Sequence, residues 1–234
     1  SDLGYGNILI TREPDLGAYF WTLCIEEEIA TEQATTALQR IGRTDLLCAL
    51  LQHPSPAVRC RALRVLAEMG NEATIPTLAE RLTTEKDGTV RAALESTIEK
   101  LETLPPPTLH VTLLGEFSAQ RGDTPITADD WQRPAARRLF QYLVLNQGKP
   151  LPRERILEDL WPNSTPDAAR SSFKTVYSWL RKAIEPYLRP KSSSRYIQVD
   201  QETYTFNSQR SPAILRSDVA KFEAVVKAVL KDAD

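Results

Sequence analysis

The chain has 234 residues, of which 41% are hydrophobic and 26% are charged, and its formal net charge at pH 7 is -2. It contains no run of about 18 apolar residues and no apolar stretch behind a basic start, which argues against a membrane span and a signal peptide. Its three cysteines are too few for a disulfide framework. We therefore expect a cytoplasmic protein of two folded domains with reduced thiols.

The small net charge hides an uneven distribution along the chain. Residues 1–107 contain 10 Lys or Arg against 16 Asp or Glu, a balance of -6, whereas residues 108–210 contain 15 against 11, a balance of +4. Within this second part, residues 165–195 carry seven basic side chains and two acidic ones. A local basic region is typical of a surface that neutralises phosphate groups.

Residues 1–25 have the least regular pattern and are left unassigned. We expect a short strand at residues 8–10 and a helix that contains Tyr19, Phe20 and Trp21. Because Ser1 is not an initiator methionine, we expect the chain to be a fragment of a longer polypeptide. Other domains of that polypeptide, such as an ATPase or a sensor, would then be partners.

Residues 26–103 repeat at an offset of 32 residues, which aligns Leu46 with Leu78 and the Val-Arg pair at 58–59 with that at 90–91. A shorter copy precedes them, so that roughly two and a half repeats are present. Each unit fits two antiparallel helices, and the pattern resembles HEAT-type repeats. Such units must stack to bury their apolar faces, so we expect the array to continue upstream and to offer a regulatory or assembly surface.

The ends of the repeat helices have recognisable signals. Ser55-Pro56 and Asp87-Gly88 are predicted helix starts, in which the side-chain oxygen caps a free backbone amide. Gly70 is a predicted helix end. Arg59 and Arg91 recur at the same place in each repeat, so we predict that they pack and hydrogen-bond within it.

Residues 104–108, Leu-Pro-Pro-Pro-Thr, form a proline-rich linker. Three consecutive prolines lack backbone donors and force extended geometry on their predecessors, so a helix cannot continue through them. We place the domain boundary here and expect a short, stiff spacer.

Residues 109–210 are predicted to form a small α+β domain, which makes the whole chain mainly α with a small α+β part. A strand over 109–117 is followed by short strands at 118–121 and 125–127 around a Gly122-Asp123 turn. Helix signals then predict helices that begin at Pro134, after Pro152 and near Asp167. A hairpin of strands at 195–199 and 203–207 completes a winged helix-turn-helix, a fold that binds double-stranded DNA.

The third predicted helix, over residues 167–185, has two different faces. Its apolar residues are spaced three and four apart and face the core. On the opposite face, short hydroxyl side chains allow close approach to bases, while long cations reach guanine acceptors or phosphates. We predict base contacts by Ser171, Lys174, Thr175 and Ser178. We predict phosphate contacts by Arg170, Arg181, Lys182, Lys191 and Arg195.

The tip of the predicted wing is acidic. Asp200 and Glu202 would repel phosphate, so we place any contact of the wing with DNA at Arg195 or in the loop over 191–195. Specificity should therefore come from the third helix.

Several short motifs, taken together, resemble those of a known protein family. They are Val111–Phe117, Arg137–Leu143, Glu158–Pro162, Leu180–Lys182, and Tyr196-Ile197 ahead of Tyr204. In this order they resemble the OmpR-type winged helix, and look most like its branch in the antibiotic regulatory (SARP) activators. The resemblance implies a third helix in the major groove and a wing near the minor groove.

The same resemblance implies partners. The loop between the second and third helices touches RNA polymerase in that family, and here it would contain Trp161, Asn163, Ser164 and Thr165. Family members often bind direct repeats as side-by-side homodimers. A helical activation domain follows the winged helix, and residues 211–234 look like its start, with a first helix over 217–226. HEAT-like repeats upstream depart from the usual arrangement.

Other interpretations stay open. The winged helix could bind protein rather than DNA, which would make the chain a scaffold or adaptor in a larger signalling protein. Trp161 fits a packing anchor better than a partner contact, and Trp179 is left undecided. Cys48, His53 and Cys60 lack the spacing of a metal-ligand set, so we favour structural thiols. Because no catalytic set or phosphate-binding loop stands out, we expect no enzyme activity, cofactor or metal.

Overall fold

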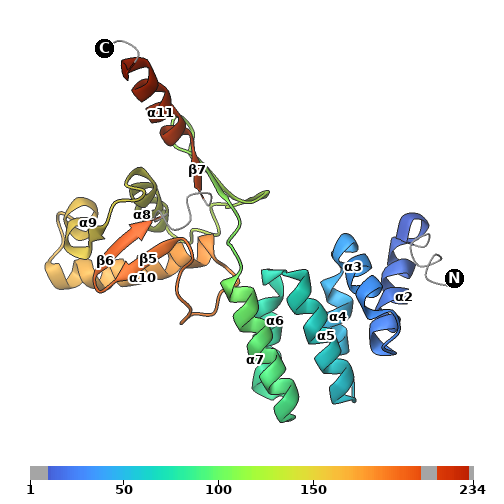
Figure 1. Cartoon of the computed structure of the whole chain (residues 1–234). Helices are drawn as coiled ribbons and strands as arrows, with labels where there is room; N and C mark the ends of the chain where they lie inside the picture. Colours follow the sequence, from blue (N-terminus) through green and yellow to red (C-terminus); the bar gives the residue numbers. More distant parts are fainter. Residues whose placement is uncertain (1–9, 207–214, 232–234) are drawn as a thin grey trace. The chain divides into compact units, whose positions relative to one another are not determined.

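The computed structural model describes residues 10–206 and 215–231 of the chain. They form two compact units (Figure 1): one takes in the chain up to Leu104 together with Tyr187–Ser192, and the other takes in Pro105–Pro186 and the chain from Ser193 onward. Most of the strand predicted at 8–10 lies outside the described residues, and Ile10 is helical. Within the described ranges, no helix has the length and apolar character needed to cross a membrane.

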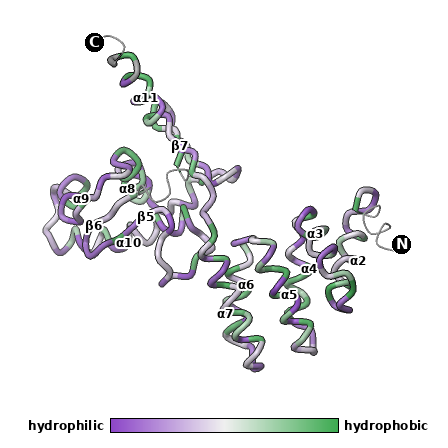
Figure 2. The backbone as a smooth tube through the Cα atoms, viewed as in Figure 1, coloured by the Kyte–Doolittle hydropathy of each residue, from purple (hydrophilic) through white to green (hydrophobic). Residues whose placement is uncertain are grey.

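The first unit is helical. It comprises α2 (Pro14–Glu26), α3 (Thr31–Ile41), the pair α4 (Thr44–Leu50) and α5 (Pro56–Met69), a short 3-10 turn at Glu72–Thr74, and the pair α6 (Ile75–Thr84) and α7 (Gly88–Thr103). Each pair packs together, and α5 also packs against α7, which confirms the predicted repeat. Hydrophobic and hydrophilic segments alternate along these helices (Figure 2), as expected for helices with one buried face.

The helical unit begins earlier than the repeat pattern indicated. The predicted helix with three aromatic residues is α2, and its Trp21 and Ile25 are buried in the same core as Leu38 and Leu63. Sequence periodicity missed this because α2 is apolar almost all round, with Tyr19 and Leu23 exposed as well. The core of the repeats therefore includes residues before 26.

One of the two predicted helix caps is wrong. The Asp87 carboxylate accepts hydrogen bonds from the backbone N–H groups of Thr89 and Val90, both at 3.0 Å, as predicted. The Ser55 hydroxyl makes no capping bond; instead, the Ser55 backbone N–H donates to Nδ1 of His53. Because Pro56 has no N–H, α5 starts with one fewer donor to satisfy. Gly70 ends this helix with a φ of 67°, as predicted.

Arg59 and Arg91 have the roles predicted for them. The Arg59 guanidinium donates to the backbone carbonyls of His53 and Pro54, at 2.7 and 3.0 Å. Arg91 donates to those of Leu82 and Glu85, at 2.8 and 3.1 Å. Each arginine thus satisfies the loop before its own helix.

Glu85 is a buried acid that the sequence did not single out. Only 3% of its side chain is exposed, and it pairs with Arg59 at 3.1 Å and Arg81 at 2.9 Å. The backbone N–H groups of Lys86 and Asp87 also donate to it. These hydrogen bonds, that from Asp87 first, hold the pKa of Glu85 below its ordinary value.

The second unit begins with a sheet in the order β3-β2-β1-β7. Its strands are β1 (Leu109–Thr112), β2 (Ser118–Arg121), β3 (Thr124–Pro125) and β7 (Leu215–Ser217). β1 is shorter than predicted because the N–H groups of Leu113 and Leu114 donate to the Asp218 carboxylate at 2.8 to 3.0 Å. β7 pairs parallel with β1, beyond the predicted domain end at 210. Three residues are too short for a periodic signal.

The helices of this unit agree closely with prediction. They are α8 (Pro134–Leu145), α9 (Arg153–Leu160) and α10 (Pro166–Ile184). A second sheet in the order β4-β6-β5 contains β4 (Leu151–Pro152), β5 (Ile197–Asp200) and β6 (Thr203–Phe206). The core lies between these helices and both sheets, around Phe140, Leu180 and Phe206. This arrangement confirms the winged helix-turn-helix predicted from the sequence.

The last described element is α11 (Asp218–Lys231), which follows β7 directly. Its start is stabilised by the Ser217 hydroxyl, which accepts a hydrogen bond from the Ala220 N–H at 3.1 Å. This element confirms the helix predicted at 217–226. Phe222 and Val225 on α11 are exposed.

Candidate nucleic-acid interface

α10 is held in place by an apolar face that packs into the unit. Phe173, Leu180 and Ile184 are buried on this face. The Phe173 ring meets the edge of Trp161 at a centroid distance of 6.3 Å and that of Tyr204, on β6, at 5.0 Å. α10 is therefore fixed between the end of α9 and the wing hairpin, so its outer face has a defined orientation.

The outer face of α10 carries the predicted base-contacting residues. Ser171, Lys174, Thr175 and Ser178 are all exposed. In the part of the chain that the structure describes, Lys174 has no ion-pair partner. The Thr175 hydroxyl donates to the backbone carbonyl of Ser171 at 3.2 Å, which leaves its oxygen lone pairs facing outward. The four side chains thus present hydroxyls and one cation together.

The predicted phosphate-contacting residues fall into two groups. The first group flanks the outer face of α10 and consists of Arg170, Arg181 and Lys182. Arg170 lies 3.5 Å from Asp167, and half of its side chain is exposed. Lys182 is exposed. Lys191 is exposed but belongs to the helical unit. Arg195 is only 12% exposed, and its Nε lies 3.5 Å from the fully buried Glu185. The structure therefore gathers three of the five on α10.

Arg181 lies beside the aromatic contact between α10 and the wing. Tyr177 stacks on Phe173 at 5.8 Å and meets the edge of Tyr204 at 5.2 Å. Burial raises the pKa of Tyr177, and the positive charge of Arg181 opposes this shift only in part. Tyr177 thus stays neutral at physiological pH.

The segment after α10 is tied to the last repeat helix. The Arg189 guanidinium donates to both carboxylate oxygens of Glu102 at 2.9 and 2.7 Å, and the Ser192 hydroxyl donates to the same group at 2.7 Å. All three residues belong to the helical unit. The hydrogen bonds from Arg189, first, and from Ser192 lower the pKa of Glu102.

Replacing Glu102 with glutamine should release the segment Tyr187–Ser192. The neutral amide cannot form the bidentate charged pair with Arg189, so tryptic cleavage after Lys191 should become about tenfold faster, as a local opening costs less. The exposed Glu80→Gln variant, on the preceding helix α6, is the control. Equal cleavage rates in the two variants would contradict this role of Glu102.

The wing agrees with its predicted position and charge. β5 and β6 pair antiparallel around a turn at Gln201, which has a φ of 52°. Asp200 and Glu202 are exposed at the tip, and Glu202 pairs with Arg153 at 2.8 Å. Arg153 therefore offsets the charge of Glu202, and the exposed Asp200 keeps the hairpin tip acidic. Asn207 and the residues that follow, up to 210, lie outside the described part.

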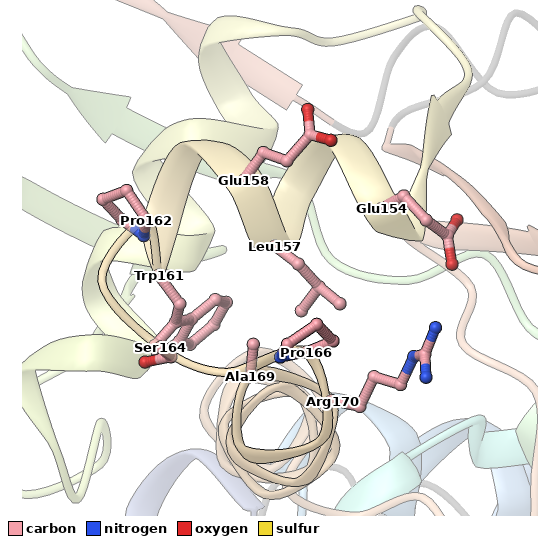
Figure 3. Close-up of a pocket in the computed structure, with 9 residues that line it drawn as sticks. All are labelled: Glu154, Leu157, Glu158, Trp161, Pro162, Ser164, Pro166, Ala169 and Arg170. Carbon is pink, nitrogen blue, oxygen red and sulfur yellow. The ribbon is translucent and has the colours of Figure 1, made fainter.

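The loop between α9 and α10 borders a groove of about 490 Å³. In Figure 3, Leu157 of α9 and Ala169 of α10 face this groove, while Glu154, Glu158 and Arg170 lie at its rim. Asn163, Ser164 and Thr165 are exposed, and Trp161 is half-buried against Phe173. The Trp161 contact supports its interpretation as a packing anchor.

Sequence reasoning missed a second basic surface, on α8. Arg133 and Arg138 line a depression of about 520 Å³ together with Ser171, Thr175 and Trp179 of α10. The Arg133 guanidinium lies 5.9 Å from the centroid of the Trp179 ring. Arg133 and Arg138 are exposed, whereas Ala136 and Leu139 of α8 are buried, and this alternation was the available signal. The sequence did not show that the two arginines lie close to α10.

The cysteine and histidine residues of the repeats are engaged in packing. Cys48 and Cys60 are half-buried free thiols, and burial raises the pKa of each. His53 Nε2 lies 3.2 Å from the Glu26 carboxylate. Across the described ranges, no three His, Cys, Asp or Glu side chains are placed to hold a metal ion.

Comparison with known families agrees with both units. Residues 26–99 match the family of HEAT repeats, and residues 132–204 match the family described as transcriptional regulatory protein, C terminal. Comparison with curated proteins and with solved structures gave no match. The chain thus combines HEAT repeats with an OmpR-type winged helix of the kind found in DNA-binding transcriptional regulators.

Proposed function

We propose that this chain binds double-stranded DNA sequence-specifically through α10, as part of a bacterial transcriptional activator. The observation that carries the proposal is the outer face of α10, where four exposed side chains combine hydroxyls with a cation. A charged helix that is only solvated more often shows Glu/Lys pairs. Such a face suits base edges in a major groove.

The residues on this face have different roles in the proposal. Ser171, Lys174, Thr175 and Ser178 contact bases, while Arg170, Arg181 and Lys182 contact phosphates. Lys191 and Arg195 were predicted as further phosphate contacts. The ion pair of Arg195 with Glu185 opposes that role, because phosphate would have to displace a buried carboxylate.

The remaining parts of the chain would supply regulation. The HEAT repeats would act as a regulatory or assembly surface, and the loop with Asn163 and Ser164, together with the groove beside it, would contact RNA polymerase. The SARP-like motifs support the assignment as an activator that binds direct repeats as a homodimer. α11, whose Phe222 and Val225 are exposed, would open the helical activation domain.

The experiment is selection of bound duplexes from a random pool, followed by binding measurements at two salt concentrations. Lys174→Ala should change the preferred base at one position, whereas Lys182→Ala should weaken binding to all sequences. The slope of log K against log salt should fall by about 0.9 for the latter, because one fewer counterion is released. Lys86→Ala, an exposed lysine of the repeats, is the control.

Two outcomes would contradict the proposal. If the wild-type chain enriches no duplex and shows no salt-dependent binding to random DNA, DNA binding by the winged helix is rejected. The alternative, a scaffold whose winged helix binds protein, is then favoured. If Lys86→Ala changes binding as much as Lys182→Ala does, the face of α10 has no special role.

A further inference from the structure

We propose that the depression between α8 and α10, which we call the α8 cleft, binds a backbone phosphate of duplex DNA. The cleft is defined by Arg133, Arg138, Ser171, Thr175 and Trp179 and has a volume of about 520 Å³. This inference rests on the proposed DNA binding by α10. It adds two cations to the proposed contact surface, Arg138 of α8 and Arg133 just before that helix.

The position of the cleft follows from the geometry of α10. Ser171 and Thr175 belong both to the cleft and to the outer face of the helix, so the two surfaces are continuous. Trp179 and Tyr177 are two residues apart and therefore point about 200° from each other around the helix axis. Because Tyr177 contacts the wing residue Tyr204, the cleft lies on the flank of α10 opposite the wing.

The chemistry of the cleft suits an anion. None of the residues that line it is acidic. Arg133 and Arg138 are exposed, and neither has an acidic partner among the described residues. The Trp179 ring, 5.9 Å from the Arg133 guanidinium, limits the positions available to that side chain. Two guanidinium groups beside the Ser171 hydroxyl match the oxygens of a phosphodiester.

The negative charge of the wing tip explains why cations outside the wing would be needed to hold the duplex. The hairpin tip is acidic, and Arg153 and Arg195 already pair with Glu202 and Glu185. The wing hairpin itself therefore offers little free positive charge. Neutralisation of phosphates on the opposite flank would hold the duplex against the outer face of α10.

The test uses the whole chain and a duplex chosen by selection with the wild type. Arg133→Gln and Arg138→Gln should each lower the slope of log K against log salt by about 0.9. Each should weaken binding at moderate salt about tenfold, with the selected sequence preference unchanged. Arg138→Lys should keep the slope, because it keeps the charge, while it loses the bidentate geometry and binds more weakly.

Arg137→Gln is the matched control, since it removes the same charge from the same helix. Arg137 packs over the Phe117 ring at 5.6 Å and does not line the cleft, so the slope should not change. If both cleft variants keep the wild-type slope of log K against log salt while the wild-type chain binds DNA, the α8 cleft does not bind a phosphate. The proposal for α10 would then be unaffected. An equal fall in slope for Arg137→Gln would also overturn the proposed role of the α8 cleft. Absence of wild-type binding would instead reject the proposed function.

Discussion

Replacing Glu85 with alanine is expected to lower the free energy of unfolding of the helical repeats by about 3 kcal/mol. The substitution removes the only carboxylate within salt-bridge distance of Arg59 among the described residues, and just 9% of the Arg59 side chain is exposed. It also leaves the N–H groups of Lys86 and Asp87 without the acceptor they use. Urea denaturation followed by far-ultraviolet circular dichroism measures the loss.

The pH dependence of stability gives an independent check on Glu85. Because its pKa is lowered in the folded state, its stabilisation is fully present above the ordinary carboxyl pKa and is lost as the pH falls through the lowered value. Glu85→Gln should remove this dependence. Glu80→Ala, at an exposed position of α6, is the control. An unfolding midpoint for Glu85→Ala equal to that of Glu80→Ala would show that the buried ion pairs contribute nothing.

Replacing Ser178 with glutamate is expected to weaken binding of the selected duplex at least about 100-fold. Ser178 is exposed near the middle of the outer face of α10, so a carboxylate there would face base acceptors and phosphates. It would also pair with Lys174 or Lys182, four residues away on the same helix, and so compete with their contacts to DNA. Like charges brought together at an interface cost several kcal/mol. Fluorescence anisotropy with labelled duplex measures the change.

Ser96→Glu is the matched control for this variant, because Ser96 is an exposed serine within α7 of the repeats. It should bind DNA as the wild type does. Both variants should keep the wild-type melting temperature, since each introduces an exposed charge. If Ser178→Glu binds within threefold of the wild type while Ser96→Glu is unchanged, α10 does not enter the groove.

The helices of the winged unit could be predicted because their signals are local. Pro134 and Pro166 mark the first turns of α8 and α10, and the three-and-four spacing of apolar residues identifies the buried face of each. The outer face of α10 followed from the same periodicity. Asp87 was predicted as a cap for the same reason, since its partners are two and three residues away.

Predictions were less accurate for residues that have more than one potential interaction partner. Ser55 has the residue type of a cap, but its hydroxyl is not used, because the surrounding loop is organised by Arg59 and His53. Arg195 has the charge of a phosphate contact, but the structure places it beside Glu185. For Ser55 the neighbours replace the interaction that the residue type predicted, and for Arg195 the ion pair with Glu185 opposes it.

The positive charge of the winged unit and the segment after α10 can be divided by what places it. The sequence alone determined that positive charge gathers in the winged unit and that α10 has one face of hydroxyls and cations, because both follow from composition and helical periodicity. The tertiary structure decided which cations remain available. It pairs Arg189 with Glu102 and Arg195 with Glu185, and it brings Arg133 and Arg138 next to Thr175. Packing of chain segments far apart in the sequence sets these contacts, and no local pattern encodes them.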